Sequence, residues 1–275
     1  MLKTQLSKVI IWNSLCVIPT FFAPGQELST AICLPKEAIN LKTSLAPKVK
    51  LSKREMQFTR NYIRHNAEDL VKIKKRSKVP FTIMDSVFDR YGLPVELKYL
   101  AVIESELKPS ALSPVGAMGP WQLMPEIARD MGLKINRHYD ERISFSKSTK
   151  AAARYLKYLY GQFGDWLLVL AAYNSGPAPV YRAIRKSQSR NFWALQYYLP
   201  LETRLHVKRY IATHYYFEGQ GSSTTLTKAE NLEYAKSLSD YNSMIQPEMK
   251  YYSVKESNIG NAKTAVQTFG YSGSL

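Results

Sequence analysis

The sequence predicts an all-α fold. Across residues 55–218, apolar side chains recur at the spacing of helix faces, and no run of alternating residues indicates a strand. Glycines and prolines divide this stretch into short segments, which is typical of helices joined by irregular connections. The 275 residues are 45% hydrophobic and 22% charged, which is the composition of a folded globular protein of one or two domains.

The helices can be placed in order along the chain. Residues 52–77 follow the 3.6-residue period of one helix, and Ser52 with Glu55 fits a capping box at its start. Gly92 ends a second helix, and Pro94 suits the first turn of a third. Residues 166–173 are almost wholly apolar, which predicts a buried helix. The remaining expected helices are 81–91, 94–104, 121–131, 147–163, 180–185, 202–218 and 228–237.

The N-terminus has the pattern of a secretion signal over residues 1–25. Lys3 and Lys8 precede an apolar stretch that is too short and too broken to span a membrane easily. Small residues before Gln26 predict cleavage there, and an uncleaved anchor is the alternative. We expect a basic linker at 26–52, a catalytic domain at 53–218 with its core at 80–217, and a tail or partial module at 219–275.

The net charge of +16 is concentrated near the N-terminus. Residues 1–78 contain 15 Lys and Arg against 5 Asp and Glu, so +10 of the charge lies there. Such an arm could bind an anionic wall polymer, a membrane surface or nucleic acid, and a solvated surface is the simpler interpretation. A secretion signal argues against nucleic acid. Two cysteines exclude a disulfide scaffold.

Glu104 is the leading candidate for a catalytic residue. It shares one helix face with Leu97, Leu100 and Ala101, at positions i, i+3, i+4 and i+7. A carboxyl at the end of an apolar face loses water, which disfavours its charged form and suits a general acid. The alternative is a structural carboxylate paired with Lys or Arg.

Two further motifs follow Glu104. The run from Ser113 to Gln122 combines two glycines with hydroxyl, amide and aromatic groups, so backbone and side chains could approach a ligand closely. A second run, 171–176, ends in Tyr173 and Asn174 before a glycine. Taken alone, that run is more typical of a helix C-cap.

In this order the motifs resemble the soluble lytic transglycosylase domain family, over roughly residues 80–217. Glu104-Ser105 with Ser113 and Gln122 resembles the first motif of the family, 171–176 the second and 199–204 the third. The group with the greatest similarity is the membrane-bound lytic murein transglycosylase D type. Its C-terminal LysM repeats have no convincing counterpart in this chain. Pro120 stands where many members have Leu, and we expect it in the first turn of the next helix.

The resemblance implies a goose-type, lysozyme-like helical domain with a glycan-binding cleft. It implies non-hydrolytic cleavage of the β-1,4 bond between N-acetylmuramic acid and N-acetylglucosamine, giving a 1,6-anhydromuramic end, with Glu104 first as acid and then as base. It places Ser113, Met118 and Gln122 against the sugar and Tyr173 and Asn174 near Glu104. Glu202 would support the cleft.

The resemblance implies peptidoglycan strands as substrate and the periplasm or cell envelope as location. It implies no metal and no cofactor, and the four histidines have no ligand spacing. Two alternatives stay open. One is a lysozyme-type hydrolase on the same fold, and the other is a non-catalytic glycan-binding or secretion scaffold protein.

Overall fold

The computed structural model describes residues 48–49 and 51–245. The chain divides into one compact unit at Lys48–Glu233 and a second made of Met1–Pro47 with Tyr234–Leu275. The expected signal and most of the expected linker lie outside the described residues. No helix in the part of the chain that is described is long and apolar enough to cross a membrane.

The prediction of an all-α fold is confirmed. Within the described residues, extended backbone pairs only at isolated bridges, such as the one between Met118 and Leu123. The α-helices and short 3-10 helices (η) are α2 (Lys53–His65), α3 (Ala67–Arg76), α4 (Lys78–Tyr91), η1 (Val95–Lys98), α5 (Tyr99–Ser105), α6 (Pro125–Asp130), η2 (Glu141–Ile143), α7 (Phe145–Phe163), α8 (Trp166–Ser175), α9 (Pro177–Ser187), α10 (Phe192–Leu195), η3 (Gln196–Tyr198), α11 (Leu201–Glu218) and η4 (Ser223–Thr225).

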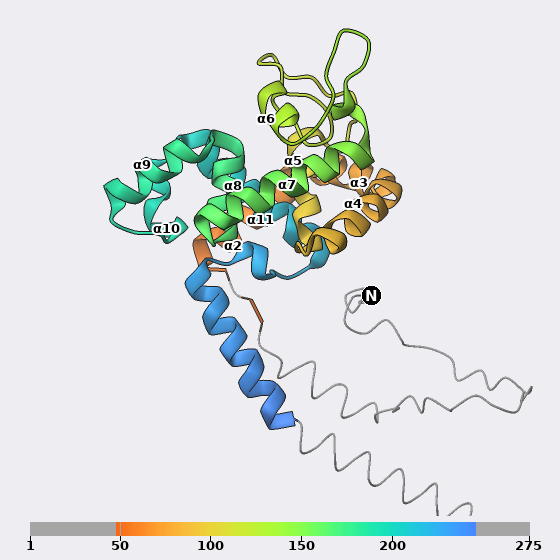
Figure 1. Ribbon diagram of the computed structural model, residues 1–275. Helices are drawn as coiled ribbons and strands as arrows, with labels where there is room; N and C mark the ends of the chain where they lie inside the picture. The colour runs from red at the N-terminus through yellow and green to blue at the C-terminus, as the bar shows by residue number, and fades with distance from the viewer. Residues whose placement is uncertain (1–47, 50, 246–275) are drawn as a thin grey trace, which may run out of the picture. The chain divides into compact units, whose positions relative to one another are not determined.

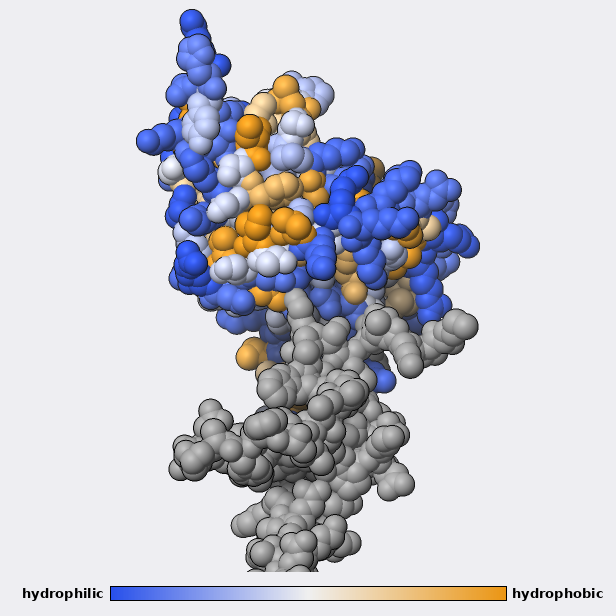
Figure 2. Space-filling view, turned by 90° about the vertical axis from the view of Figure 1, so that its right-hand side faces the viewer, coloured by the Kyte–Doolittle hydropathy of each residue, from blue (hydrophilic) through white to orange (hydrophobic). Residues whose placement is uncertain are grey.

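Helix α8 is the centre of the core, as its apolar sequence predicts. Every residue from Trp166 to Ala172 is buried, and α7, α9 and α11 pack against it. Asp165 caps its first turn by accepting hydrogen bonds from the backbone N–H groups of Leu167 and Leu168. Figure 1 shows α7 crossing in front of α8, with α6 and its long loops at the top of the domain. Figure 2 shows one face of the molecule, on which hydrophilic residues surround hydrophobic patches.

Three predicted helices differ from the observed ones. The helix expected at 52–77 is divided at Asn66, whose backbone N–H and side-chain amide both donate to the Tyr62 carbonyl and end α2. The helix expected at 94–104 begins as a 3-10 turn, η1. The helix expected at 121–131 starts only at Pro125, so Pro120 lies in a turn instead of a helix.

Backbone pairing explains the late start of α6. Met118 and Leu123 exchange two backbone hydrogen bonds, and the residues between them form a tight turn. Gln122 completes this turn with a φ of 45°, which is incompatible with a right-handed helix. The helix therefore begins after the turn, with Pro125 in its first position, where a missing N–H costs nothing.

The basic N-terminal charge belongs largely to the folded unit. Of the 15 Lys and Arg in residues 1–78, nine lie at 53–78, in α2, α3 and the start of α4. The basic N-terminal part of the sequence therefore includes residues that the structure places in helices. The excess positive charge is mostly presented by helices.

The folded unit also continues beyond residue 218, where we expected the tail to begin. Thr224, Thr225, Leu226 and Thr227 are buried, and the backbone N–H of Lys228 donates to the Asp165 carboxylate at 2.6 Å. This segment therefore contributes to the cap of α8. Residues 228–245 are helical, and those from 234 onward belong to the second unit.

His214 is a buried titratable group of α11. Its Nε2 lies 2.9 Å from the Ser222 hydroxyl, and its Nδ1 has no hydrogen-bond partner in the part of the chain that the structure describes. Burial lowers the pKa of His214 to about 4, although the Glu218 carboxylate opposes this shift. The folded protein therefore takes up a proton at His214 less readily than the unfolded chain does.

The free energy of unfolding should fall as the pH is lowered from about 6.5 to about 4, and His214 should contribute up to about 3 kcal/mol of the loss. Below that range both states are protonated, so the loss due to His214 is complete and changes no further. Urea unfolding at a series of pH values, with His214→Gln in parallel, measures it. Equal pH dependence in the two proteins would contradict the assignment.

Candidate active site

Glu104 lies in the last turn of α5, where the apolar face ends. Leu97, Leu100 and Ala101 are fully buried on this face, as the spacing predicts. The Glu104 side chain is 14% exposed, and its Oε1 lies 2.8 Å from Nε2 of His206 on α11. The carboxyl is thus mostly removed from water and contacts an imidazole, not a Lys or Arg.

The backbone directly after Glu104 is held in an unusual conformation. Glu106 and Leu107 have φ values of 56° and 63°, in the left-handed region that non-glycine residues rarely adopt. Arg76 of α3 donates two hydrogen bonds to the Glu106 carbonyl, at 3.0 and 2.7 Å, and the Leu107 side chain is buried. These contacts fix the end of α5 and hence the position of Glu104.

Three hydrogen bonds attach the following loop to three helices. The Ser105 hydroxyl of α5 donates to the Pro120 carbonyl at 2.9 Å, and the Tyr173 hydroxyl of α8 donates to the Trp121 carbonyl at 2.7 Å. The Trp121 indole N–H donates to the Thr149 hydroxyl of α7 at 2.9 Å. The turn at 119–122 is thereby fixed relative to Glu104.

Arg142 supports the same loop from the other side. Its guanidinium is buried, forms an ion pair with Asp140, and donates to the carbonyls of Gly116 and Leu123 at 2.7 and 2.8 Å. Its own carbonyl lies so close to Gly119 that no side chain fits there. One charged group therefore satisfies several loop carbonyls at once.

Ser113, Met118 and Gln122, which we expected to face a sugar, all lie in this loop. Ser113 accepts a hydrogen bond from the backbone N–H of Ala117 at 2.9 Å, and the Gln122 amide donates to the carbonyls of Ala111 and Gly119. The Met118 sulfur lies 3.9 Å from the Arg142 guanidinium. Ser113 and Gln122 thus shape the loop, and their role towards a ligand stays a prediction.

The other expected site residues, Tyr173, Asn174 and Glu202, lie on helices α8 and α11. Tyr173 lies near Glu104, and burial together with the Glu104 carboxylate raises its pKa, so its hydroxyl stays a neutral donor. Asn174 accepts a hydrogen bond from Thr203 at 2.9 Å, which connects the end of α8 to the start of α11. Glu202 is exposed and forms an ion pair with Arg209.

His206 is the residue that the sequence analysis missed. It was counted among histidines without ligand spacing, yet it is 4% exposed and contacts Glu104 across 102 positions of sequence. The signal available was its place two residues after the motif at 199–204, on the same helix. Within the described residues, no His, Cys, Asp and Glu cluster could hold a metal ion.

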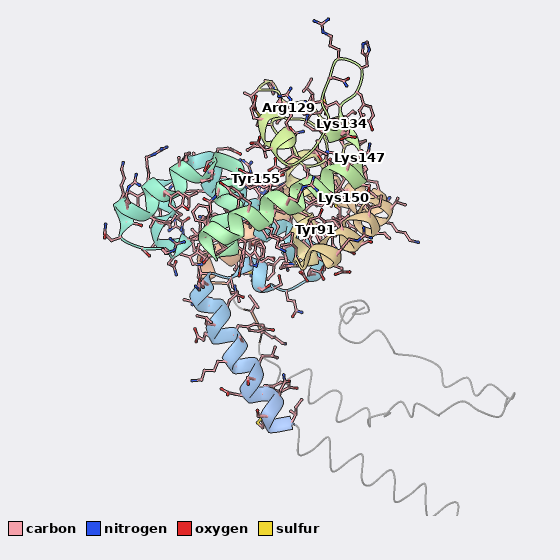
Figure 3. The ribbon with its side chains drawn as sticks, in the orientation of Figure 1. Tyr91, Arg129, Lys134, Lys147, Lys150 and Tyr155 are labelled. Carbon is pink, nitrogen blue, oxygen red and sulfur yellow. The ribbon has the colours of Figure 1, made fainter. Side chains whose placement is uncertain are left out.

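Basic side chains surround the loops above α5. Figure 3 shows Arg129, Lys134, Lys147 and Lys150 around α6 and the first half of α7. Lys147 forms an ion pair with Glu141 at 2.6 Å and contacts the Tyr139 hydroxyl. Such a cluster produces a positive field over this part of the domain, which favours partners that carry negative groups.

Comparison with known proteins finds similarity in the central part of the chain. Residues 88–196 match the family described as transglycosylase SLT domain. Membrane-bound lytic murein transglycosylase D of Escherichia coli (strain K12) is 42% identical over 126 residues, which cover 44% of this chain and 27% of that protein. Soluble lytic murein transglycosylase of Salmonella typhimurium is 31% identical over 145 residues, which cover 48% of this chain and 22% of that protein. The chain thus spans about a quarter of the length of these relatives.

A solved structure shares the fold. It is the complex of the 70-kDa soluble lytic transglycosylase with bulgecin A, which is 23% identical in sequence and has a TM-score of 0.51. The likeness covers 70% of this chain and 34% of that one. At this level of identity it supports the helical fold alone.

Gly119→Ala should destabilise the protein strongly. Its φ is +85°, and an added Cβ would collide with the Arg142 carbonyl, so we expect a loss of at least about 3 kcal/mol in the free energy of unfolding. Gly116→Ala is the matched control in the same loop. Gly116 has a φ of +88° and open space around it, so about 1–2 kcal/mol is expected. Urea unfolding measures both, and equal losses would contradict a steric role for Arg142.

Proposed function

We propose that this chain is a lytic transglycosylase that acts on the glycan strands of murein, because residues 88–196 match the transglycosylase SLT domain family. The observation that supports this most directly is the Glu104 carboxyl. It is mostly buried, lies at a rigid helix end, and stands beside a loop that three helices hold in place. This is the environment that general acid catalysis requires.

The proposed reaction begins with the protonated carboxyl of Glu104. Its proton goes to the glycosidic oxygen between N-acetylmuramic acid and N-acetylglucosamine while the bond from the muramic C1 to that oxygen breaks. The glucosamine residue leaves with a free 4-hydroxyl. The Glu104 carboxylate then takes the proton of the muramic 6-hydroxyl, and the O6 atom bonds to C1. The carboxyl regains its proton, and the product ends in a 1,6-anhydro ring.

This sequence of steps needs one protein carboxylate, because the substrate supplies the nucleophile. The described acidic residues nearest in sequence to the motifs are engaged elsewhere. Glu106 pairs with Arg76 and Lys108, and Glu202 pairs with Arg209. The polar partner of Glu104 in the described part of the chain is His206. A lysozyme-type hydrolase on this fold would instead activate a water molecule, and a silent scaffold would need no acid.

Sugar contacts are proposed for the loop that carries Ser113, Met118 and Gln122. Side-chain hydrogen bonds from Arg142 and Gln122 hold carbonyls of the loop, and Ser113 accepts one from its backbone, which supports a preformed surface for a ligand. A rigid surface of this kind lowers the entropic cost of holding a glycan strand. The basic residues of α2 and α3 are proposed to favour an anionic wall or membrane surface in the cell envelope.

Glu104→Gln should reduce the release of soluble fragments from purified murein by about 1,000-fold, since general acid and base catalysis is lost. The matched control is Glu126→Gln, which removes an exposed carboxylate of α6 and should stay within about twofold of the wild type. Circular dichroism verifies that both variants fold. Full activity in the Glu104 variant would overturn the proposal.

A further inference from the structure

The imidazole ring of His206 contacts Glu104 through one of its two nitrogens. His206 lies in the second turn of α11, is 4% exposed, and reaches Oε1 of Glu104 through Nε2 at 2.8 Å. Its other nitrogen, Nδ1, is buried and has no hydrogen-bond partner among the described residues. The two ring nitrogens therefore have very different surroundings.

The unpartnered Nδ1 indicates the protonation state of the ring. An imidazolium carries a proton on both nitrogens, so the buried Nδ1 would present a charged N–H with no acceptor. Leaving a charged donor unpaired in the interior costs more than leaving a neutral nitrogen unpaired. The geometry therefore favours a neutral ring, with its single proton on Nε2, where an acceptor is present.

The two oxygens of Glu104 are also unlike each other. Oε1 meets the imidazole, whereas Oε2 has no hydrogen bond within the described residues and is not among the fully buried polar atoms. Solvent therefore reaches Oε2. In this arrangement one oxygen is held by the protein and the other is available for proton transfer.

We propose that His206 is a positioning residue for Glu104. As a neutral imidazole it donates Nε2–H to Oε1 in both protonation states of the carboxyl, and so leaves Oε2 to carry the proton to and from the glycan. The inference rests on the function proposed above. Because one tautomer serves both steps, His206 neither gains nor loses a proton in the reaction, and its contribution is geometric.

Substitution separates positioning from proton transfer. Gln at this position keeps a neutral N–H donor but cannot titrate, whereas Leu removes the donor. With a soluble muropeptide oligomer as substrate, we expect kcat of His206→Leu to fall about 100-fold with little change in KM, and kcat of His206→Gln to stay within about fivefold of wild type. If His206→Gln falls as far as His206→Leu, or if His206→Leu is fully active, the proposal is overturned.

His214→Leu is the matched control, because His214 lies on the same helix, is equally buried, and also has an unpartnered Nδ1. It contacts Ser222 instead of Glu104, so its kcat should equal that of wild type even though its stability falls. A loss of kcat like that of His206→Leu would mean that the effect comes from stability, and this would contradict the proposal.

A second readout does not depend on activity. Nitrogen-15 NMR of the imidazole rings at neutral pH should show His206 with a protonated Nε2 and a bare Nδ1, and the His206→Gln spectrum assigns the signal by its absence. A ring protonated on Nδ1, or on both nitrogens, would overturn the inference. If the wild type shows the expected tautomer but does not cleave murein, the result contradicts the proposed function and not the hydrogen bond between His206 and Glu104.

Discussion

The site depends on one constraint, which is that a carboxyl group is held out of water at the end of a seven-residue helix. Helix α5 is too short to be stable by itself, so its position comes from tertiary contacts. Its apolar face is buried in the core, and Arg76 binds the carbonyl that follows the last turn. Two residues in left-handed conformation then lead the chain away. The position of Glu104 is therefore set by contacts with α3 and α11 as much as by α5.

The loop after α5 is fixed beside Glu104 by hydrogen bonds to three helices. Its central turn binds α5, α7 and α8 through hydrogen bonds from Ser105, Trp121 and Tyr173, and Arg142 satisfies carbonyls that would otherwise need water. A polar network that is satisfied in this way is rigid. The motif residues are far apart in sequence, and Ser105, Trp121 and Tyr173 hold the backbone beside Glu104.

The sequence predicts those parts of the site that depend on the local spacing of apolar, glycine and polar residues. The apolar face below Glu104, the buried helix α8 and the loop between Ser113 and Gln122 can all be recognised from spacing and composition. The late start of α6 could not, because the pairing of Met118 with Leu123 and the positive φ of Gln122 depend on how the loop packs. Asn66 divides one helical pattern into two for a similar reason, since its side chain competes for the Tyr62 carbonyl.

The contact between His206 and Glu104 could not be predicted from the sequence. Its contact with Glu104 joins α11 to α5, and no local pattern shows which face of α11 meets the carboxyl. Glu202, one turn earlier on α11, was expected to support the site, but it points to solvent and pairs with Arg209. The packing of α11 on α5 and α8 determines that His206, and not Glu202, faces Glu104.

The central claim is that one protein carboxylate suffices because the substrate supplies its own nucleophile. Digesting purified murein in water labelled with heavy oxygen, followed by mass spectrometry of the fragments, tests this most directly. We expect fragments that lack one water relative to hydrolysis products and contain no label. Labelled reducing ends would show that water is the nucleophile, and would assign the chain to hydrolases on the same fold.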